Sequence, residues 1–118
     1  MLEKLQGMDN KTLVIFTEAG DGIGFGHLMR CKAIADAFRE LNWTVSIHLY
    51  WKGAACPTED DLRVYNWHTQ PISEDGVNAQ IALIDSYLAE ASVYQSIAQK
   101  YIFTCAIDDY NRLVFPVE

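Results

Sequence analysis

One short segment of the chain gathers most of the residue types that carry out chemistry. Residues 22–30 contain three glycines, followed by His27 and Arg30. Glycine allows a close approach of the backbone, and the free N–H groups at the start of a following helix attract anionic or polar ligand atoms. An imidazole titrates near neutral pH and can take a proton from water or from a hydroxyl group. His27 is therefore a candidate catalytic base; the alternative is a histidine that only caps or packs at the helix start.

The glycine spacing argues against two familiar nucleotide motifs. A dinucleotide fingerprint needs its third glycine inside the helix, where this chain has Leu28 and Met29, and no Gly-Lys-Ser/Thr follows to make a P-loop. Gly24 and Gly26 are instead candidates for contacting a substrate through the backbone. Arg30, one turn further on, either lies on a solvated helix face or orients a loop carboxylate or a ligand.

A second group of polar residues follows two later apolar runs. Asp85 and Tyr87 follow one run, and Asp108, Asp109 and Tyr110 follow the last one. The aspartate pair could bind a divalent cation or a hydroxyl group, or it could be solvated at a strand end. The tyrosines could stack on or hydrogen-bond to a sugar, or they could close the edge of the sheet.

The pattern of apolar residues predicts the elements that must position these groups. Near-continuous apolar runs typical of strands buried on both faces alternate with helical spacing. We expect strands at 12–17, 43–50, 63–67, 80–85 and 102–107, helices at 26–42 and 89–100, and a flexible segment at 1–10. This alternation predicts a Rossmann-like α/β domain over 11–118, with a parallel sheet and helices on both faces. Ligands of such sheets bind outside the carboxyl ends of the strands, where the strand order reverses. Glu18 and His27 follow the first strand, so we expect them at this edge with the later polar residues.

Length and charge exclude several classes of function. The chain has 118 residues and a formal net charge of −7, with nine Lys and Arg in total. One domain with a real core fits this length, and a nucleic-acid footprint is excluded because the few basic residues are scattered. The sequence has no membrane-span pattern and no secretory-signal pattern, so we expect a cytoplasmic protein.

The cysteines and histidines do not form a metal-ligand pattern. Cys31, Cys56 and Cys105 lack CxxC spacing, and we expect mostly buried, reduced thiols, with Cys31 on a helix stripe and Cys105 inside a strand. His48 and His68 share no ligand spacing with another histidine and receive no role. We therefore expect neither a metal nor a cofactor.

Several motifs together resemble a known family. These are IGFGHLMRC at 23–31, LIDSY at 83–87 and IDDYNR at 107–112, after Thr17 and Glu18. They resemble the UDP-sugar hydrolases of pseudaminic acid biosynthesis over about residues 11–118. That family is similar to the GT-B glycosyltransferases, which have two Rossmann-like domains with a cleft between them. This chain resembles the first, N-terminal domain.

The resemblance implies a function. It implies metal-independent hydrolysis of a UDP-linked diacetamido trideoxy sugar: water attacks the anomeric carbon, UDP leaves and the configuration inverts. The residue matching the family's base is His27, and Asp85, Tyr87 and Asp109 would contact the sugar. The family holds the nucleotide mainly with its C-terminal domain, which we expect to lie outside these 118 residues. We therefore expect no activity from this chain alone, and self-association through an apolar patch.

Two other functions remain open from the sequence. One is the acceptor-binding half of a GT-B glycosyltransferase, in which His27 would deprotonate an acceptor hydroxyl group instead of water. The other is a non-catalytic, truncated sugar-binding domain.

Overall fold

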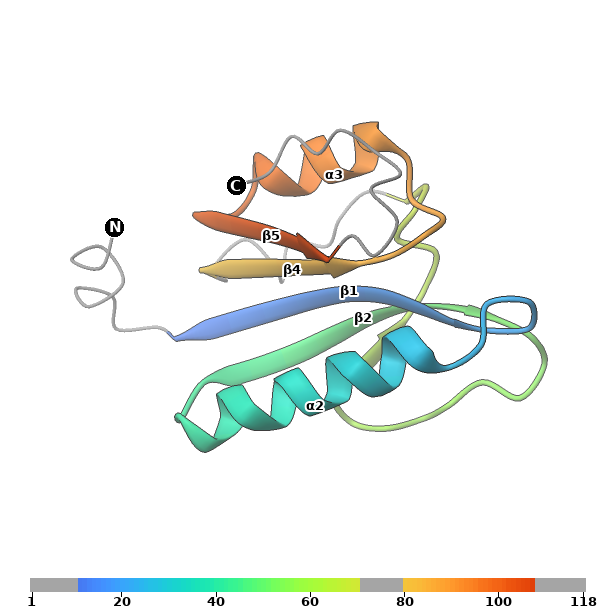
Figure 1. Cartoon of the computed structure of the whole chain (residues 1–118), viewed down its shortest axis with the longest axis horizontal. Helices are drawn as coiled ribbons and strands as arrows, with labels where there is room; N and C mark the ends of the chain where they lie inside the picture. Colours follow the sequence, from blue (N-terminus) through green and yellow to red (C-terminus); the bar gives the residue numbers. More distant parts are fainter. Residues whose placement is uncertain (1–10, 71–79, 108–118) are drawn as a thin grey trace.

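Five parallel strands form one sheet in the computed structural model, which describes residues 11–70 and 80–107. The strand order is β3-β2-β1-β4-β5. The strands are β1 (Thr12–Gly20), β2 (Thr44–Lys52), β3 (Leu62–Val64), β4 (Ile81–Asp85) and β5 (Phe103–Ile107), and the helices are α2 (Gly26–Glu40) and α3 (Ala91–Ala98). In Figure 1, α2 runs along β1 and β2, and α3 lies beside β4 and β5. The predicted Rossmann-like α/β fold is confirmed.

The alternation of side chains along β1 explains why both faces of the sheet are covered. Leu13 and Ile15 pack in one buried cluster with Leu28 and Cys31 of α2. Residues of the opposite parity, such as Phe16, pack in a second cluster under α3. Successive side chains of a strand point to opposite faces, so a strand that is apolar at both parities needs a helix on each side.

The cysteine prediction was right for Cys31 and wrong for Cys105. Cys31 is buried under α2, whereas Cys56 and Cys105 are exposed. Cys105 pairs with Leu83 across β4 and β5 and so shares the face of the sheet that α2 covers. Since α2 packs on β1 and β2, no helix of the described residues covers this face of the edge strand β5.

Most predicted elements have shifted ends rather than changed type. The difference that matters for the site is in β1, which continues to Gly20 instead of ending at residue 17, so Glu18 lies inside the strand and not in the following loop. The β3 strand is shorter than the expected 63–67. Among the described residues, no helix is long and apolar enough to cross a membrane.

The strand order reverses between β1 and β4. From β1 the chain crosses to β2 and β3 on one side, and then returns to β4 on the other. The order therefore reverses between β1 and β4, which are neighbours and pair in parallel, with Thr17 opposite Asp85. In open α/β sheets this is where loops diverge and ligands bind, at the carboxyl ends of the strands.

Candidate functional site

A tight glycine turn after β1 brings the start of α2 to this edge. Gly20 and Gly24 hydrogen-bond to each other through their backbones, at 3.1 Å and 2.8 Å. Gly20 has φ +121°, and a Cβ there would lie 2.0 Å from the carbonyl oxygen of Lys52. Gly24 also has a positive φ, +82°, whereas Gly26 is the first residue of α2 and has open space around it. The turn thus requires Gly20 and favours Gly24, and Gly26 leaves the helix start unobstructed.

The central contact of the site joins His27 to Asp85. The Nδ1 atom of His27 lies 2.7 Å from Oδ1 of Asp85, and the two side chains are 5% and 1% exposed. An ionised carboxylate only accepts hydrogen bonds, so the neutral imidazole must carry its proton on Nδ1. The lone pair is then on Nε2, which makes no hydrogen bond within residues 11–70 and 80–107. This is the tautomer that a general base needs.

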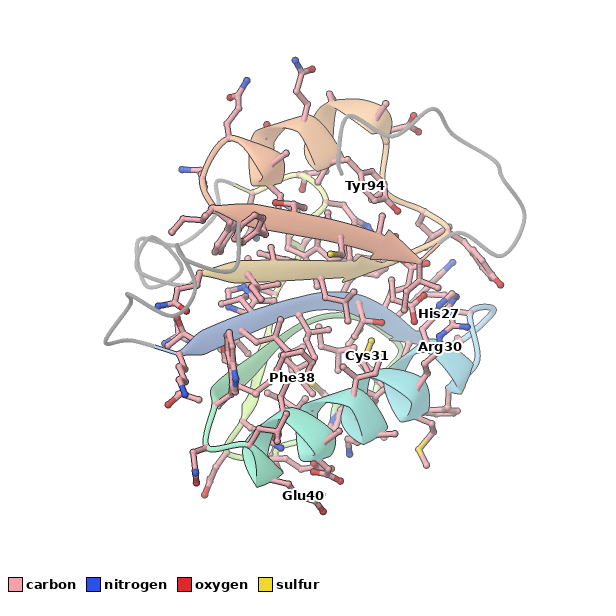
Figure 2. All side chains as sticks on the ribbon, turned by 60° about the vertical axis from the view of Figure 1, so that its left-hand side comes forward. His27, Arg30, Cys31, Phe38, Glu40 and Tyr94 are labelled. Atoms are coloured by element: carbon pink, nitrogen blue, oxygen red, sulfur yellow. The ribbon has the colours of Figure 1, made fainter. Side chains whose placement is uncertain are left out.

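Arg30 binds the same carboxylate with two atoms of its guanidinium group. Its Nε lies 2.8 Å from Oδ2 of Asp85, and its Nη2 lies 2.8 Å from Oδ1. Of the two alternatives for Arg30, the structure shows the contact with a carboxylate, while the side chain itself is 37% exposed. Figure 2 shows His27 and Arg30 together near the ends of the strands. Cys31, the residue after Arg30 in α2, is labelled beside them. A two-point contact fixes the carboxylate's orientation as well as its charge.

Two further residues complete the α2 side of the site. The hydroxyl group of Thr17 donates to the backbone oxygen of Asp85 at 3.0 Å. The thiol of Cys31 lies 3.7 Å from Oδ2 of Asp85. Burial, with the nearby Asp85 carboxylate, raises the pKa of Cys31 to about 12, although Thr17 and Arg30 oppose this. The protonated thiol is a poor nucleophile, in agreement with the structural role expected from the sequence.

Tyr87 contributes an aromatic wall to the site. Its ring meets the imidazole of His27 edge to face, with centroids 4.2 Å apart and planes at 81°. Asp85 is the last residue of β4 and Tyr87 lies two residues further on, so the end of this strand and the loop after it supply both the partner of His27 and its aromatic neighbour. The structure thereby brings together His27, Arg30, Asp85 and Tyr87 from the predicted set. Asp109 and Tyr110 lie outside the described residues.

A second buried carboxylate, Glu18, lies on the other face of the same edge. Glu18 is 0% exposed and accepts a hydrogen bond from the hydroxyl group of Ser86. The backbone N–H groups of Tyr87 and Leu88 donate to its Oε2 at 2.7 Å and 3.2 Å. His68 Nε2 lies 3.1 Å from its Oε1. Burial alone would raise the pKa of Glu18, but these hydrogen bonds and the His68 ring lower it below its ordinary value.

The sequence analysis assigned no role to His68, and the structure shows why the residue was missed. His68 lies 50 positions from Glu18, in a turn without periodicity. Its ring stacks on Tyr50, at 4.4 Å between centroids, and meets Trp67 edge to face. One signal was available: Glu18 has the parity of Phe16 and so faces the interior, where a carboxylate needs donors.

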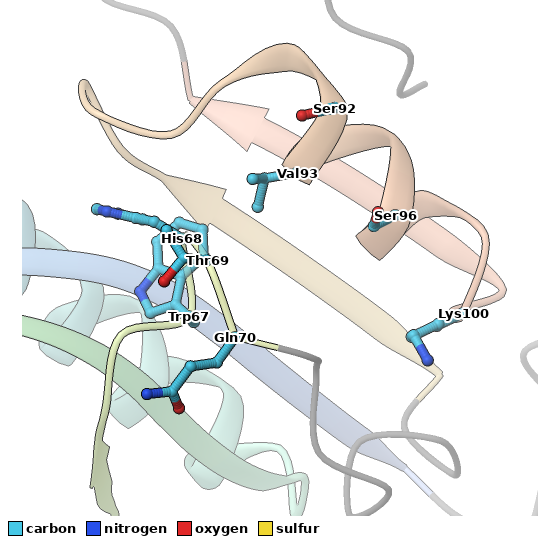
Figure 3. Close-up of a pocket in the computed structure, with 8 residues that line it drawn as sticks. All are labelled: Trp67, His68, Thr69, Gln70, Ser92, Val93, Ser96 and Lys100. Carbon is cyan, nitrogen blue, oxygen red and sulfur yellow. The ribbon is translucent and has the colours of Figure 1, made fainter.

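A cavity of about 410 Å³ lies between the turn at 67–70 and α3, and His68, which contacts Glu18, is one of the residues that line it. Figure 3 shows Ser92, Val93 and Ser96 on the α3 side, Lys100 beyond the helix end, and His68 and Gln70 across from them. His27 does not line this cavity. In the part of the chain that the structure describes, no group of three or more His, Cys, Asp or Glu is placed to hold a metal ion.

Comparison of the chain with protein-family models, curated proteins and solved structures finds no match.

Proposed function

We propose that this protein is the catalytic-base half of a nucleotide-sugar hydrolase. The observation that carries the proposal is the 2.7 Å contact between His27 Nδ1 and the buried Asp85 carboxylate at the point where the strand order reverses. This contact leaves the lone pair of the neutral imidazole on Nε2. A histidine held in this way can take a proton from water and carry the resulting positive charge beside a carboxylate.

The reaction needs one proton acceptor and one stabilised leaving group. Water attacks the anomeric carbon while His27 Nε2 takes its proton, and the bond between that carbon and the diphosphate oxygen breaks. UDP then leaves with the bonding electron pair, and the configuration at the anomeric carbon inverts. The N–H groups in the first turn of α2, which has no side-chain cap, favour developing negative charge.

Support for the substrate class comes from the motifs at 23–31, 83–87 and 107–112 and from their resemblance to the UDP-sugar hydrolases of pseudaminic acid biosynthesis. Tyr87 and Asp109 are the proposed sugar contacts, with Gly24, Gly26 and Tyr110 as further contacts. The nucleotide would be held mainly by a second GT-B-type domain or by a partner chain.

A GT-B glycosyltransferase is the second candidate, because a base on Nε2 serves an acceptor hydroxyl group as well as it serves water. The same histidine, carboxylate and arginine would then act on a different nucleophile. Dependence on an acceptor therefore separates the two enzymes.

The test measures release of UDP from a UDP-diacetamido-trideoxy sugar by the chain, alone and mixed with a separately expressed GT-B-type C-terminal domain. We expect release without an acceptor in the mixture, and a loss of roughly 10²–10⁴-fold in His27→Asn. The control is Asp36→Asn, an exposed position on the same helix. Release only with an acceptor identifies a transferase, and sugar binding without turnover in any pairing refutes both enzymes.

A further inference from the structure

Tyr87 is held from two directions. Its ring contacts His27 on the α2 side of the sheet, while its backbone N–H donates to Oε2 of Glu18 at 2.7 Å. Glu18 has the parity of Phe16, which faces α3, and Asp85 contacts His27 and Arg30 of α2. The two carboxylates thus lie on opposite faces of one sheet edge, and Tyr87 connects them.

The hydrogen bonds of Glu18 are concentrated on the loop that carries Tyr87. Within the described residues, three of its four hydrogen-bonding partners are consecutive: the Ser86 hydroxyl and the backbone N–H groups of Tyr87 and Leu88. The Ser86 oxygen in turn accepts from the backbone N–H groups of Leu88 and Ala89, at 3.2 Å and 3.0 Å. One carboxylate therefore determines the path of the chain from β4 toward α3.

We infer that Glu18 is a positioning residue for the His27 site. It makes no contact with the imidazole and acts through Tyr87, whose ring limits the orientations open to His27. With that ring in place, Nδ1 stays on Asp85 and Nε2 stays available. Displacing the 86–88 loop would leave the imidazole free to turn. The structural part of this inference is independent of the reaction, and its kinetic part rests on the proposed function.

The atoms around Glu18 distinguish a conservative substitution from a disruptive one. In Glu18→Gln the amide oxygen can take the Oε2 position and accept from Tyr87 and Leu88. The amide NH₂ group then faces His68 Nε2, which accepts a hydrogen bond when the ring proton is on Nδ1. It also faces the Ser86 oxygen, which already accepts from Leu88 and Ala89, so the Ser86 hydroxyl proton must turn away from it. Glu18→Met has a similar length but offers no such acceptor, so it leaves the backbone N–H groups without a partner. Glutamine should preserve the position of Tyr87, and methionine should not.

The test records the imidazole C–H proton signals of His27 by NMR in the full chain, assigned by their loss in His27→Gln. The ring current of Tyr87 changes the chemical shifts of these protons, because the two rings are in contact. Tyr87→Leu and Glu18→Met should therefore move the signals in the same direction, and the double variant Tyr87→Leu/Glu18→Met should move them no further than Tyr87→Leu alone. Glu18→Gln should leave them in place. If Glu18→Met does not fold, Glu18→Asp, whose carboxylate is one methylene group shorter, must move the signals where Glu18→Gln does not.

Two results would overturn the inference. One is a folded Glu18→Met or Glu18→Asp protein with His27 signals at the wild-type positions, and the other is Tyr87→Leu without effect on them. In the UDP-release assay we expect a decrease in kcat of about tenfold or more for Glu18→Met, with little change for Glu18→Gln, since small displacements of a catalytic group are costly. The expected NMR shifts without turnover in the wild-type mixture would refute the hydrolase and leave the positioning role supported.

Discussion

Replacing Asp85 with asparagine removes the charge at the centre of the site and keeps the shape of the side chain. Oδ1 of Asp85 faces both Arg30 Nη2 and His27 Nδ1, and Oδ2 faces Arg30 Nε. An amide has only one oxygen, so its NH₂ group must face at least one donor of Arg30 in either orientation. The two-point contact is therefore lost, whichever way the amide turns.

The cost in stability follows from the number of contacts and their exposure. Three hydrogen bonds to an ionised group would each contribute about 1.5–3 kcal/mol if none could be replaced. Arg30 is 37% exposed and can turn toward water, so much of its share is recovered. We expect Asp85→Asn to lower the free energy of unfolding by about 2–4 kcal/mol, measured by urea denaturation with tryptophan fluorescence. The control Asp36→Asn, at a position 76% exposed, should change it by less than about 0.5 kcal/mol.

The same substitution tests the tautomer of His27. If the amide NH₂ takes the Oδ1 position it donates to Nδ1, and the imidazole proton moves to Nε2. Long-range ¹H–¹⁵N NMR of the neutral ring should show an unprotonated Nε2 in the wild-type protein and a population with protonated Nε2 in Asp85→Asn. UDP release should fall by roughly 10²–10⁴-fold. Unfolding like that of the control, with Nε2 still fully unprotonated, would refute this reasoning.

Three further predictions follow from single positions. Gly20→Ala should lower the free energy of unfolding, measured by urea denaturation, by more than about 2 kcal/mol, because the new Cβ would meet a backbone oxygen. Gly26→Ala, where the Cβ enters open space, should leave the free energy of unfolding unchanged or raise it by up to about 1 kcal/mol. Equal effects of the two substitutions would contradict the turn geometry. Cys56 should react with iodoacetamide at pH 8, whereas Cys31, with its pKa near 12, should react only after unfolding, and equal rates would contradict its burial. Because folding lowers the pKa of Glu18 from 4.5, its ionised form stabilises the fold above that pH, and this contribution is lost as the pH falls through the folded pKa. Glu18→Gln should therefore cost more unfolding free energy at pH 7 than at pH 3, and an equal cost at both would show that the pKa is not lowered.

Local patterns were sufficient for the type of every described element. Continuous apolar runs predicted the strands, and the spacing of Leu28, Cys31 and Ala35 predicted the stripe that α2 buries. Patterns also led to His27, Arg30, Asp85 and Tyr87, because polar residues directly after buried strands must lie at one edge of a parallel sheet. The burial of Cys105 was predicted wrongly, since an apolar run does not reveal whether its strand is at the centre or the edge.

The contacts within the site depend on which strands are neighbours, and this is not a local property. His27 and Asp85 are 58 positions apart, and Glu18 and His68 are 50 apart. His27 and Asp85 meet because β4 lies beside β1 in the sheet. Glu18 and His68 meet because the turn after β3 reaches the face of the sheet that α3 covers.

The sequence by itself determined the alternation of strands and helices, the glycine turn and the edge at which the polar residues gather, because periodicity and backbone freedom are written in neighbouring residues. Only the tertiary structure decided that Arg30 binds Asp85, that Nδ1 of His27 faces the Asp85 carboxylate, and that Glu18 is buried among donors from 67–70 and 86–88. Those outcomes depend on strand order and side-chain packing. Both are set by contacts between residues far apart in the chain, so no short stretch of sequence predicts them.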